Sequence, residues 1–145
     1  MFLIYDTETT GLPKDYNAPI TNSDNWPRMV QISWQLHDEK GQLVEVKNYI
    51  IKPEGYEIPY AVVKVHGITT ERAEKQGVAL SMVLEKFNET LEKTTFVVGH
   101  NIEFDNNIIG AEFHRKSIAT PLFERSSLDT KNESTNYCAI PGGKG

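Results

Sequence analysis

Two carboxylates that follow an apolar segment are the residues of this sequence best suited to chemistry. Met1 to Tyr5 is apolar and predicts a strand, and Asp6 and Glu8 come next, with one residue between them. Alternate residues of a strand share one face, so these two side chains are expected to project together. Two like charges side by side are costly unless a cation lies between them. The spacing therefore indicates part of a divalent-metal site.

Composition narrows the choice of metal. The chain has 145 residues, of which 39% are hydrophobic, which is the size of one domain with a real core. Its single cysteine, Cys138, excludes an internal disulfide and a thiolate zinc cluster. Oxygen ligands select a hard cation, so we expect Mg²⁺ or Mn²⁺.

Charge and hydropathy narrow the class of protein. The net charge of −5 argues against non-specific binding along a polyanion, although it allows capture of a chain end. No segment approaches the roughly 20 apolar residues of a membrane span. We therefore expect a soluble, cytoplasmic protein with no membrane partner.

Hydrophobic periodicity predicts three strands in the first part of the chain. They cover the opening segment, 30–36 and 43–51, and the last two form a hairpin across a turn at 38–41. The proline-containing segment 12–28 is expected to be a long loop. Its Tyr16 and Trp26 either rim the site or pack against the fold.

The second part alternates helices with short strands. Thr69 or Thr70 is expected to cap a short helix over 68–75, which Gly77 ends. The remaining expected elements are a helix over 80–91, a strand over 95–98, a helix over 106–116 and a short strand within 122–128, with no periodicity after residue 131. This order predicts an α/β fold with a mixed sheet and flanking helices. Ligands of such sheets lie at the carboxyl ends of strands, where Asp6, Glu8 and the segment 100–105 fall.

Three separated motifs resemble those of the DEDD exonucleases, and in particular the proofreading epsilon-subunit branch associated with bacterial DNA polymerase III. They are Asp6-Thr-Glu8-Thr-Thr-Gly11-Leu12, Val65-His66-Gly-Ile-Thr69 and Gly99-His-Asn101-x-x-Phe104-Asp105. The resemblance implies a ribonuclease H-like fold and 3′→5′ hydrolysis of phosphodiester bonds with two divalent metal ions. It also implies the 3′ end of single-stranded DNA as substrate, with RNA possible, and a DNA polymerase catalytic subunit as a possible partner.

The resemblance also assigns roles to residues. Asp6 and Glu8 would be catalytic metal ligands, with Asp6 bridging the two ions, and Asp105 would be the third carboxylate. The substrate-binding residues would be Thr7, Thr9, Gly11, Leu12, His66, Asn101 and Phe104. In this set Thr7 and Thr9 present backbone groups to the terminal nucleotide, Gly11 and Leu12 shape a turn and a base contact, and the other three line the pocket.

Several of these residues have a purely structural alternative. Asn101 either contacts substrate or caps the following helix. Phe104 either stacks on a base or belongs to the core, and His66 with Gly67 either faces substrate or forms a turn. His100 is expected to be a hydrogen-bonded structural histidine.

One part of the family pattern is absent. The family places a histidine or tyrosine shortly before a fourth aspartate, and no such pair follows Asp105 in this sequence. His114 would lie on the opposite face of its helix from Asp105, and Asp129 directly follows a strand, so neither replaces the missing pair. We therefore expect residues 1–145 to be a single exonuclease domain truncated at its C-terminus, with an exposed apolar sheet surface. Such a chain would bind Mn²⁺ or Mg²⁺ weakly and have little or no activity.

Three other functions compete with this interpretation. The missing motif favours a non-catalytic module that binds nucleic acid or tethers a polymerase. RNA-trimming exonucleases share the same motifs. Haloacid-dehalogenase-like phosphatases also begin with a strand and an acidic pair, but they carry aspartate where this chain has Glu8.

Overall fold

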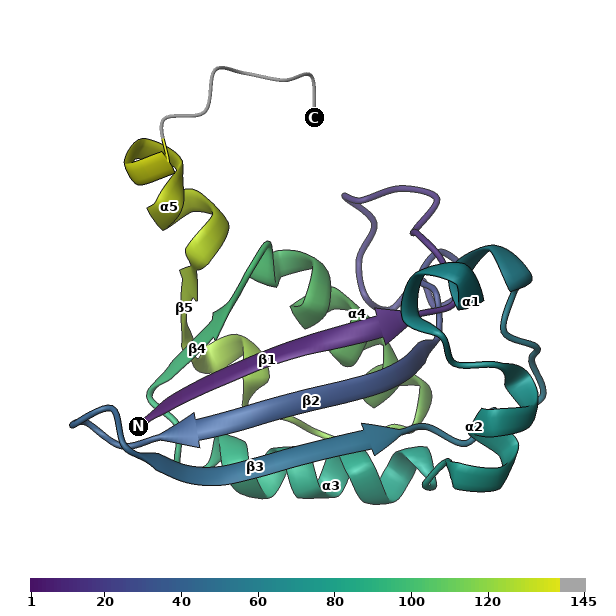
Figure 1. The fold of residues 1–145 in the computed structure, drawn as a ribbon, viewed down its shortest axis with the longest axis horizontal. Coiled ribbons are helices and arrows are strands. Elements are labelled where there is room, and N and C mark those ends of the chain that lie inside the picture. The colour runs from purple at the N-terminus through teal and green to yellow at the C-terminus, as the bar shows by residue number, and fades with distance from the viewer. Residues whose placement is uncertain (139–145) are drawn as a thin grey trace.

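The computed structural model of the protein describes residues 1–138, which are built around a five-stranded sheet (Figure 1). The strands are β1 (Phe2–Thr9), β2 (Met29–His37), β3 (Leu43–Ile50), β4 (Phe96–Gly99) and β5 (Ser126–Asp129). Their order is β3-β2-β1-β4-β5. The pairs β1/β2 and β2/β3 are antiparallel, whereas β1/β4 and β4/β5 are parallel. The expected mixed sheet and hairpin are confirmed, while segment 139–145, where the expected truncation falls, lies outside the described residues.

The structure has five α-helices and one 3₁₀ helix within residues 1–138, and two of them cover one face of the sheet. The helices are α1 (Tyr60–His66), α2 (Thr70–Gln76), α3 (Leu80–Leu91), α4 (Ile102–Arg115), α5 (Thr130–Cys138) and the short 3₁₀ helix η1 (Leu122–Glu124). Figure 1 shows α3 and α4 behind the sheet, while α5 continues from β5 away from it. Phe87 of α3 and Phe113 of α4 are buried in the same core cluster as Leu3 of β1. No helix within residues 1–138 is long and apolar enough to cross a bilayer.

The other face of the sheet carries exposed apolar side chains. Ile4, Val46 and Leu128 lie on it, with exposed fractions of 42%, 54% and 38%. Asp6 lies on the same face, because residues two apart in β1 point to the same side. Asp6 therefore lies on the uncovered face of the sheet, beside exposed apolar side chains.

A buried carboxylate ties the long loop to α4. Glu112 is fully buried and accepts hydrogen bonds from Arg28 Nε at 3.0 Å and from the backbone N–H of Met29 at 2.9 Å. It also pairs with Arg115 at 3.1 Å. The same Arg115 donates to the carbonyl of Trp26 at 2.7 Å. These contacts fix segment 12–28, which has no helix or strand, as expected.

Two helices were not predicted from hydrophobic spacing. In α1, which has seven residues, none is fully buried, and Val62 and Val63 pack against a small core cluster that contains Ile58 and Ile68. The helix ends where Gly67 adopts a left-handed conformation, with φ of 76°. Segment 130–138 forms α5, whose first turn is capped when Asp129 Oδ1 accepts the N–H of Lys131 at 2.9 Å. Hydrophobic periodicity detects helices that are long enough to show an apolar face, whereas α1 is short and the sequence of α5 is mostly polar.

Two other boundaries differ from the prediction. Helix α4 begins at Ile102, not at 106, because Asn101 adopts φ of 60° and turns the chain directly after β4. Half of the expected final strand is η1, and β5 starts only at Ser126. The predicted cap of α2 is confirmed, since Thr69 accepts the N–H of Arg72.

Candidate active site

Strand β1 divides its residues between two functions. Asp6 and Glu8 point to the uncovered face of the sheet, where Asp6 is exposed and Glu8 is half-buried. Tyr5 and Thr7 point to the opposite face and are buried against the core. The predicted shared face of the two carboxylates is confirmed.

Asp105 approaches β1 from the first turn of α4. It is 3% exposed, and its Oδ1 accepts hydrogen bonds from the backbone N–H of Thr7 at 3.0 Å and from Thr7 Oγ1 at 2.5 Å. Next to it, the hydroxyl of Tyr5 donates to Oδ1 of Asn106. Two neighbouring residues of α4 thus bind two alternate residues of β1, which fixes the first turn of the helix.

Burial sets the protonation of Asp105. The pKa of its carboxyl group is raised from 3.8 to about 6, chiefly by desolvation and also by the negative charge of Asp6, while the hydrogen bonds from Thr7 lower it. Burial also raises the pKa of the Tyr5 hydroxyl, so this group stays protonated and donates to Asn106. The negative charge of Asp6 thus acts on the carboxyl group of Asp105.

This pKa predicts how the stability of the metal-free protein changes with pH. Because the folded state holds the proton of Asp105 more tightly than the unfolded chain does, the proton stabilises the fold fully below pH 3.8. This contribution is lost as the pH rises through about 6. We expect urea unfolding in EDTA to show this loss for the native chain and a flatter profile for Asp105→Asn. Parallel profiles would contradict the assignment.

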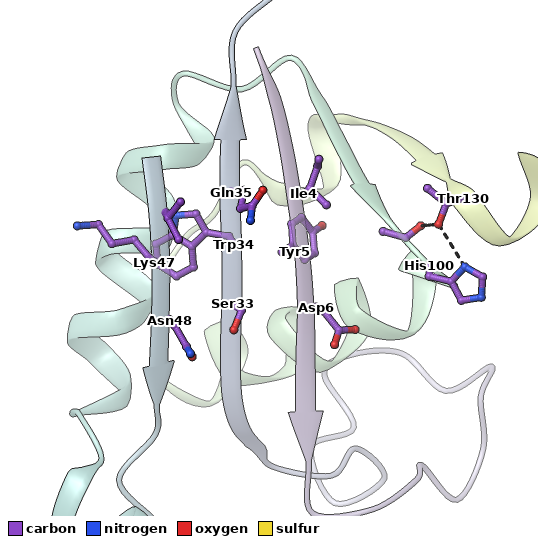
Figure 2. A pocket seen from close by; sticks show the side chains of 12 residues that line it. Ile4, Tyr5, Asp6, Ser33, Trp34, Gln35, Lys47, Asn48, His100 and Thr130 are labelled. Atoms are coloured by element: carbon purple, nitrogen blue, oxygen red, sulfur yellow. Dashed lines mark hydrogen bonds between the residues drawn. The ribbon is translucent and has the colours of Figure 1, made fainter. Parts of the chain in front are cut away.

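Two neighbouring hollows contain the carboxylates of β1. The first, of about 680 Å³, is lined by Asp6 together with Ser33, Asn48, His100 and Thr130, among others. Figure 2 shows Asp6, Ser33 and Asn48 in a row across three strands, with His100 and Thr130 beyond β1. The second hollow, of about 290 Å³, contains Glu8. Within residues 1–138, no three His, Cys, Asp or Glu side chains converge as a metal-binding group.

The hollow at Glu8 brings together most of the expected substrate residues. Its lining consists of Thr7, Glu8, Thr9, Gly11, Leu12, Val62, Val65, His66 and Phe104. We call it the Glu8 hollow. Every substrate-side residue that the resemblance assigned is present except Asn101. Residues of β1, α1 and α4, far apart in the sequence, therefore share one surface.

Hydrogen bonds give both threonines of this hollow a structural role. The N–H of Thr7 is donated to Asp105, so this group is not available to a nucleotide, and Thr7 instead orients a carboxylate. The hydroxyl of Thr9 donates to the carbonyl of Gly11 at 2.6 Å and accepts its N–H at 3.3 Å. Thr9 thus closes the turn that presents Leu12, which is 72% exposed.

His66 is the last residue of α1 rather than part of a simple turn. Its Nδ1 accepts the N–H of Ile68 at 3.1 Å, which places the proton of the neutral ring on Nε2. That nitrogen is buried and has no hydrogen-bond partner among the described residues. Since His66 lines the Glu8 hollow, Nε2–H is a donor that a ligand can satisfy.

Asp129 stabilises the segment after β4, a role that the sequence did not reveal. Asn101 occupies the N-cap position of α4, but its side chain makes no capping hydrogen bond. Instead its backbone N–H is donated to Asp129 Oδ1 at 2.9 Å. Backbone donors of this kind lower the pKa of Asp129, whose carboxylate therefore orders the turns after β4 and β5. His100 has the expected structural contact, with Nδ1 3.2 Å from Thr130 Oγ1.

The aromatic residues that the sequence analysis named differ in their burial. Phe104 packs against the core and also lines the Glu8 hollow, so both of its proposed roles have a structural basis. Trp26 is 3% exposed and donates Nε1–H to the carbonyl of Pro19, whereas Tyr16 is 55% exposed. Tyr5 and Asn106 are ordinary residues of a strand and a helix, and only their contact identifies them as supports of the site.

Comparison with known proteins identifies the family. The family model described as exonuclease matches residues 3–137. The DNA polymerase III PolC-type of Mycoplasmopsis pulmonis is 31% identical over 131 residues, and that of Streptococcus thermophilus is 29% identical over 136 residues. These matches cover 90% and 93% of this chain but only 8% of each polymerase.

Solved structures share the fold. E. coli exonuclease I in complex with a dT13 oligonucleotide has a TM-score of 0.75 and 22% sequence identity, over 98% of this chain and 30% of that chain. Its complex with a dA16 oligonucleotide has a TM-score of 0.76 and 19% identity, over 99% and 32% of the two chains.

The strand order, the helices on one face and the acidic pair on β1 define a ribonuclease H-like nuclease domain. The chain belongs to the exonuclease family, and its resemblance to the polymerase III branch is confirmed by the PolC-type relatives. The reaction of this family depends on divalent metal ions.

Proposed function

We propose that this chain binds the 3′ end of a nucleic acid strand as part of a two-metal 3′→5′ exonuclease. The observation that supports the proposal is the Glu8 hollow, whose lining includes Glu8, His66 and Phe104. Asp6 lies two residues before Glu8 on the same face of β1. A nuclease that removes terminal nucleotides needs a confined pocket for one nucleotide next to anionic metal ligands. This arrangement provides both.

Three carboxylates are the proposed metal ligands. Asp6, Glu8 and Asp105 offer only oxygen donors, which fits Mg²⁺ or Mn²⁺. When bound, two such ions supply an activated water and stabilise the leaving oxygen. Thr7 orients Asp105 by two hydrogen bonds to Oδ1. A cation bound by Asp6 and Asp105 would relieve the repulsion between these two carboxylates.

The other residues of the Glu8 hollow position the strand end. His66 offers Nε2–H to an acceptor oxygen of the terminal nucleotide, while Leu12 and Phe104 provide apolar surface for its base. The sequence lacks the third motif, so no side chain is assigned to orient or deprotonate the attacking water. We therefore expect binding with slow or no cleavage by residues 1–145.

We propose that the substrate is DNA and that the chain acts in DNA replication. The support is the name of the PolC-type relatives and the DNA oligonucleotides in the exonuclease I complexes. The chain spans 8% of the length of those polymerases, so contact with a polymerase catalytic subunit is also a proposal.

A linear oligonucleotide and a circular one of the same sequence test the proposal. We expect fluorescence anisotropy with Mg²⁺ to show tighter binding of the linear form, because only it has a 3′ end, and tighter binding of DNA than of the matching RNA. Equal affinity for the circle would overturn end recognition. Brisk release of nucleotides would contradict the expected weak activity. End-specific binding with slow or no release of nucleotides is the expected result.

A further inference from the structure

A third, smaller hollow lies where the long loop meets the start of α4. It has a volume of about 120 Å³ and is lined by Tyr16, Asn17, Trp26, Asn101, Glu103, Phe104 and Asn107. At roughly 30 Å³ per water molecule this is the space of about four waters, which suits one ring system better than a whole nucleotide. We call it the Tyr16 hollow.

The lining of the Tyr16 hollow has the chemistry of a nucleobase site. Three aromatic rings offer flat apolar surface, and three asparagine amides with one glutamate offer donors and acceptors at its edges. Bases are recognised by stacking on aromatic side chains and by hydrogen bonds to their polar edges. No lysine or arginine lines it, which disfavours a phosphate.

The loop holds Tyr16 in place before any ligand binds. Asn25 is 7% exposed, accepts the N–H of Asp15 at 2.7 Å and donates Nδ2–H to the carbonyl of Asp15 at 2.9 Å. Asp15 in turn accepts the N–H of Asn17 at 2.9 Å. Tyr16 lies between these anchored residues and is still 55% exposed. Because the backbone on both sides of Tyr16 is anchored, the loop loses little conformational entropy when a ligand binds.

Phe104 connects this hollow to the proposed site of the terminal nucleotide. The same residue lines the Tyr16 hollow and the Glu8 hollow. A strand whose last nucleotide occupies the Glu8 hollow has its neighbouring nucleotide one step away, on the other side of this shared wall.

We propose that the Tyr16 hollow binds the base of the nucleotide next to the 3′-terminal one, with Tyr16 as the stacking residue. This inference rests on the proposed function, because it needs a strand end in the Glu8 hollow. Glu103 can only accept hydrogen bonds when ionised, so the hollow favours bases with an exocyclic amino group, such as cytosine and adenine, over thymine.

Isothermal titration of short DNA ligands with Mg²⁺ tests the inference. The ligands are thymidine 5′-monophosphate and 5′-phosphorylated dinucleotides that end in thymidine, with cytosine, thymine or an abasic sugar at the second position. Chromatography after each titration checks that the dinucleotide is intact. Stacking of one base corresponds to about 5- to 150-fold in affinity, so the cytosine dinucleotide should bind the native chain tighter than the abasic one by that factor.

Tyr16→Ala should remove this gain for the cytosine dinucleotide and leave the affinities for the abasic dinucleotide and the monophosphate unchanged. Glu103→Gln should reduce the preference for cytosine over thymine. Tyr60→Ala is the matched control, because Tyr60 is 74% exposed and lines neither hollow.

The outcomes separate this inference from the proposed function. If the monophosphate binds but the second base adds no affinity, or if Tyr16→Ala weakens all ligands equally, the Tyr16 hollow is not a base site and the proposed function stands. If neither the monophosphate nor any dinucleotide binds, both proposals are overturned.

Discussion

Replacing Glu112 with alanine is expected to lower the free energy of unfolding by about 3–5 kcal/mol, the largest effect on stability of any single change considered. Glu112 is fully buried, and the side chains of its partners Arg28 and Arg115 are only 21% and 15% exposed. Removal of the carboxylate leaves two poorly hydrated guanidinium groups and the N–H of Met29 without their acceptor.

Urea unfolding followed by circular dichroism measures this effect. Glu71→Ala is the matched control, since Glu71 also pairs with a cation, Lys75 at 2.9 Å, but its side chain is 78% exposed. An exposed pair of this kind is worth about 0.5 kcal/mol or less. A loss below about 1 kcal/mol in Glu112→Ala would show that the buried network does not hold the loop to α4.

Replacing Asp6 with asparagine is expected to weaken Mn²⁺ binding by tenfold or more, which corresponds to about 1.4 kcal/mol. The variant keeps the shape of the side chain and removes the charge that a hard cation needs. In the metal-free protein the same variant should lower the pKa of Asp105. Because the charge of Asp6 helps to raise the pKa of Asp105, its removal should move that pKa toward the ordinary value.

Two measurements separate these effects. Mn²⁺ affinity is read from the electron paramagnetic resonance signal of the free ion, and the pKa of Asp105 from the carboxyl chemical shift in metal-free protein. Glu39→Gln, in the exposed turn between β2 and β3, removes the same charge away from the site. Unchanged Mn²⁺ affinity in Asp6→Asn would exclude Asp6 as a ligand. An unchanged pKa of Asp105 would show that the two carboxylates do not interact.

The sequence predicted the parts of the fold that repeat. The alternation of β1 correctly placed Asp6 and Glu8 on one face, and the helical spacing of α3 gave its buried residues. The mixed sheet followed from the order of elements. By contrast, α1 has only seven residues and α5 has a mostly polar sequence, so hydrophobic spacing gave no clear signal for them.

The supports of the site were not predictable from pattern. The hydrogen bonds between Thr7 and Asp105 join residues 98 positions apart, and nothing in either segment specifies the other. Family resemblance gave the residue types of the site, but it did not show that Thr7 donates its N–H to Asp105. Likewise the burial of Glu112 depends on a loop and a helix that meet only in three dimensions.

The parallel pairing of β1 with β4 determines when the site can form during folding. Strands β1, β2 and β3 are joined by antiparallel pairing of segments close in sequence, whereas Phe2 pairs with Phe96 across most of the chain. Closing so long a loop costs entropy before its contacts compensate. The acidic pair of β1 can therefore be displayed on an early hairpin sheet, but Asp105 joins it only after β4 and α4 have docked. On a ribosome, the two halves of the site meet only after α4 has been synthesised.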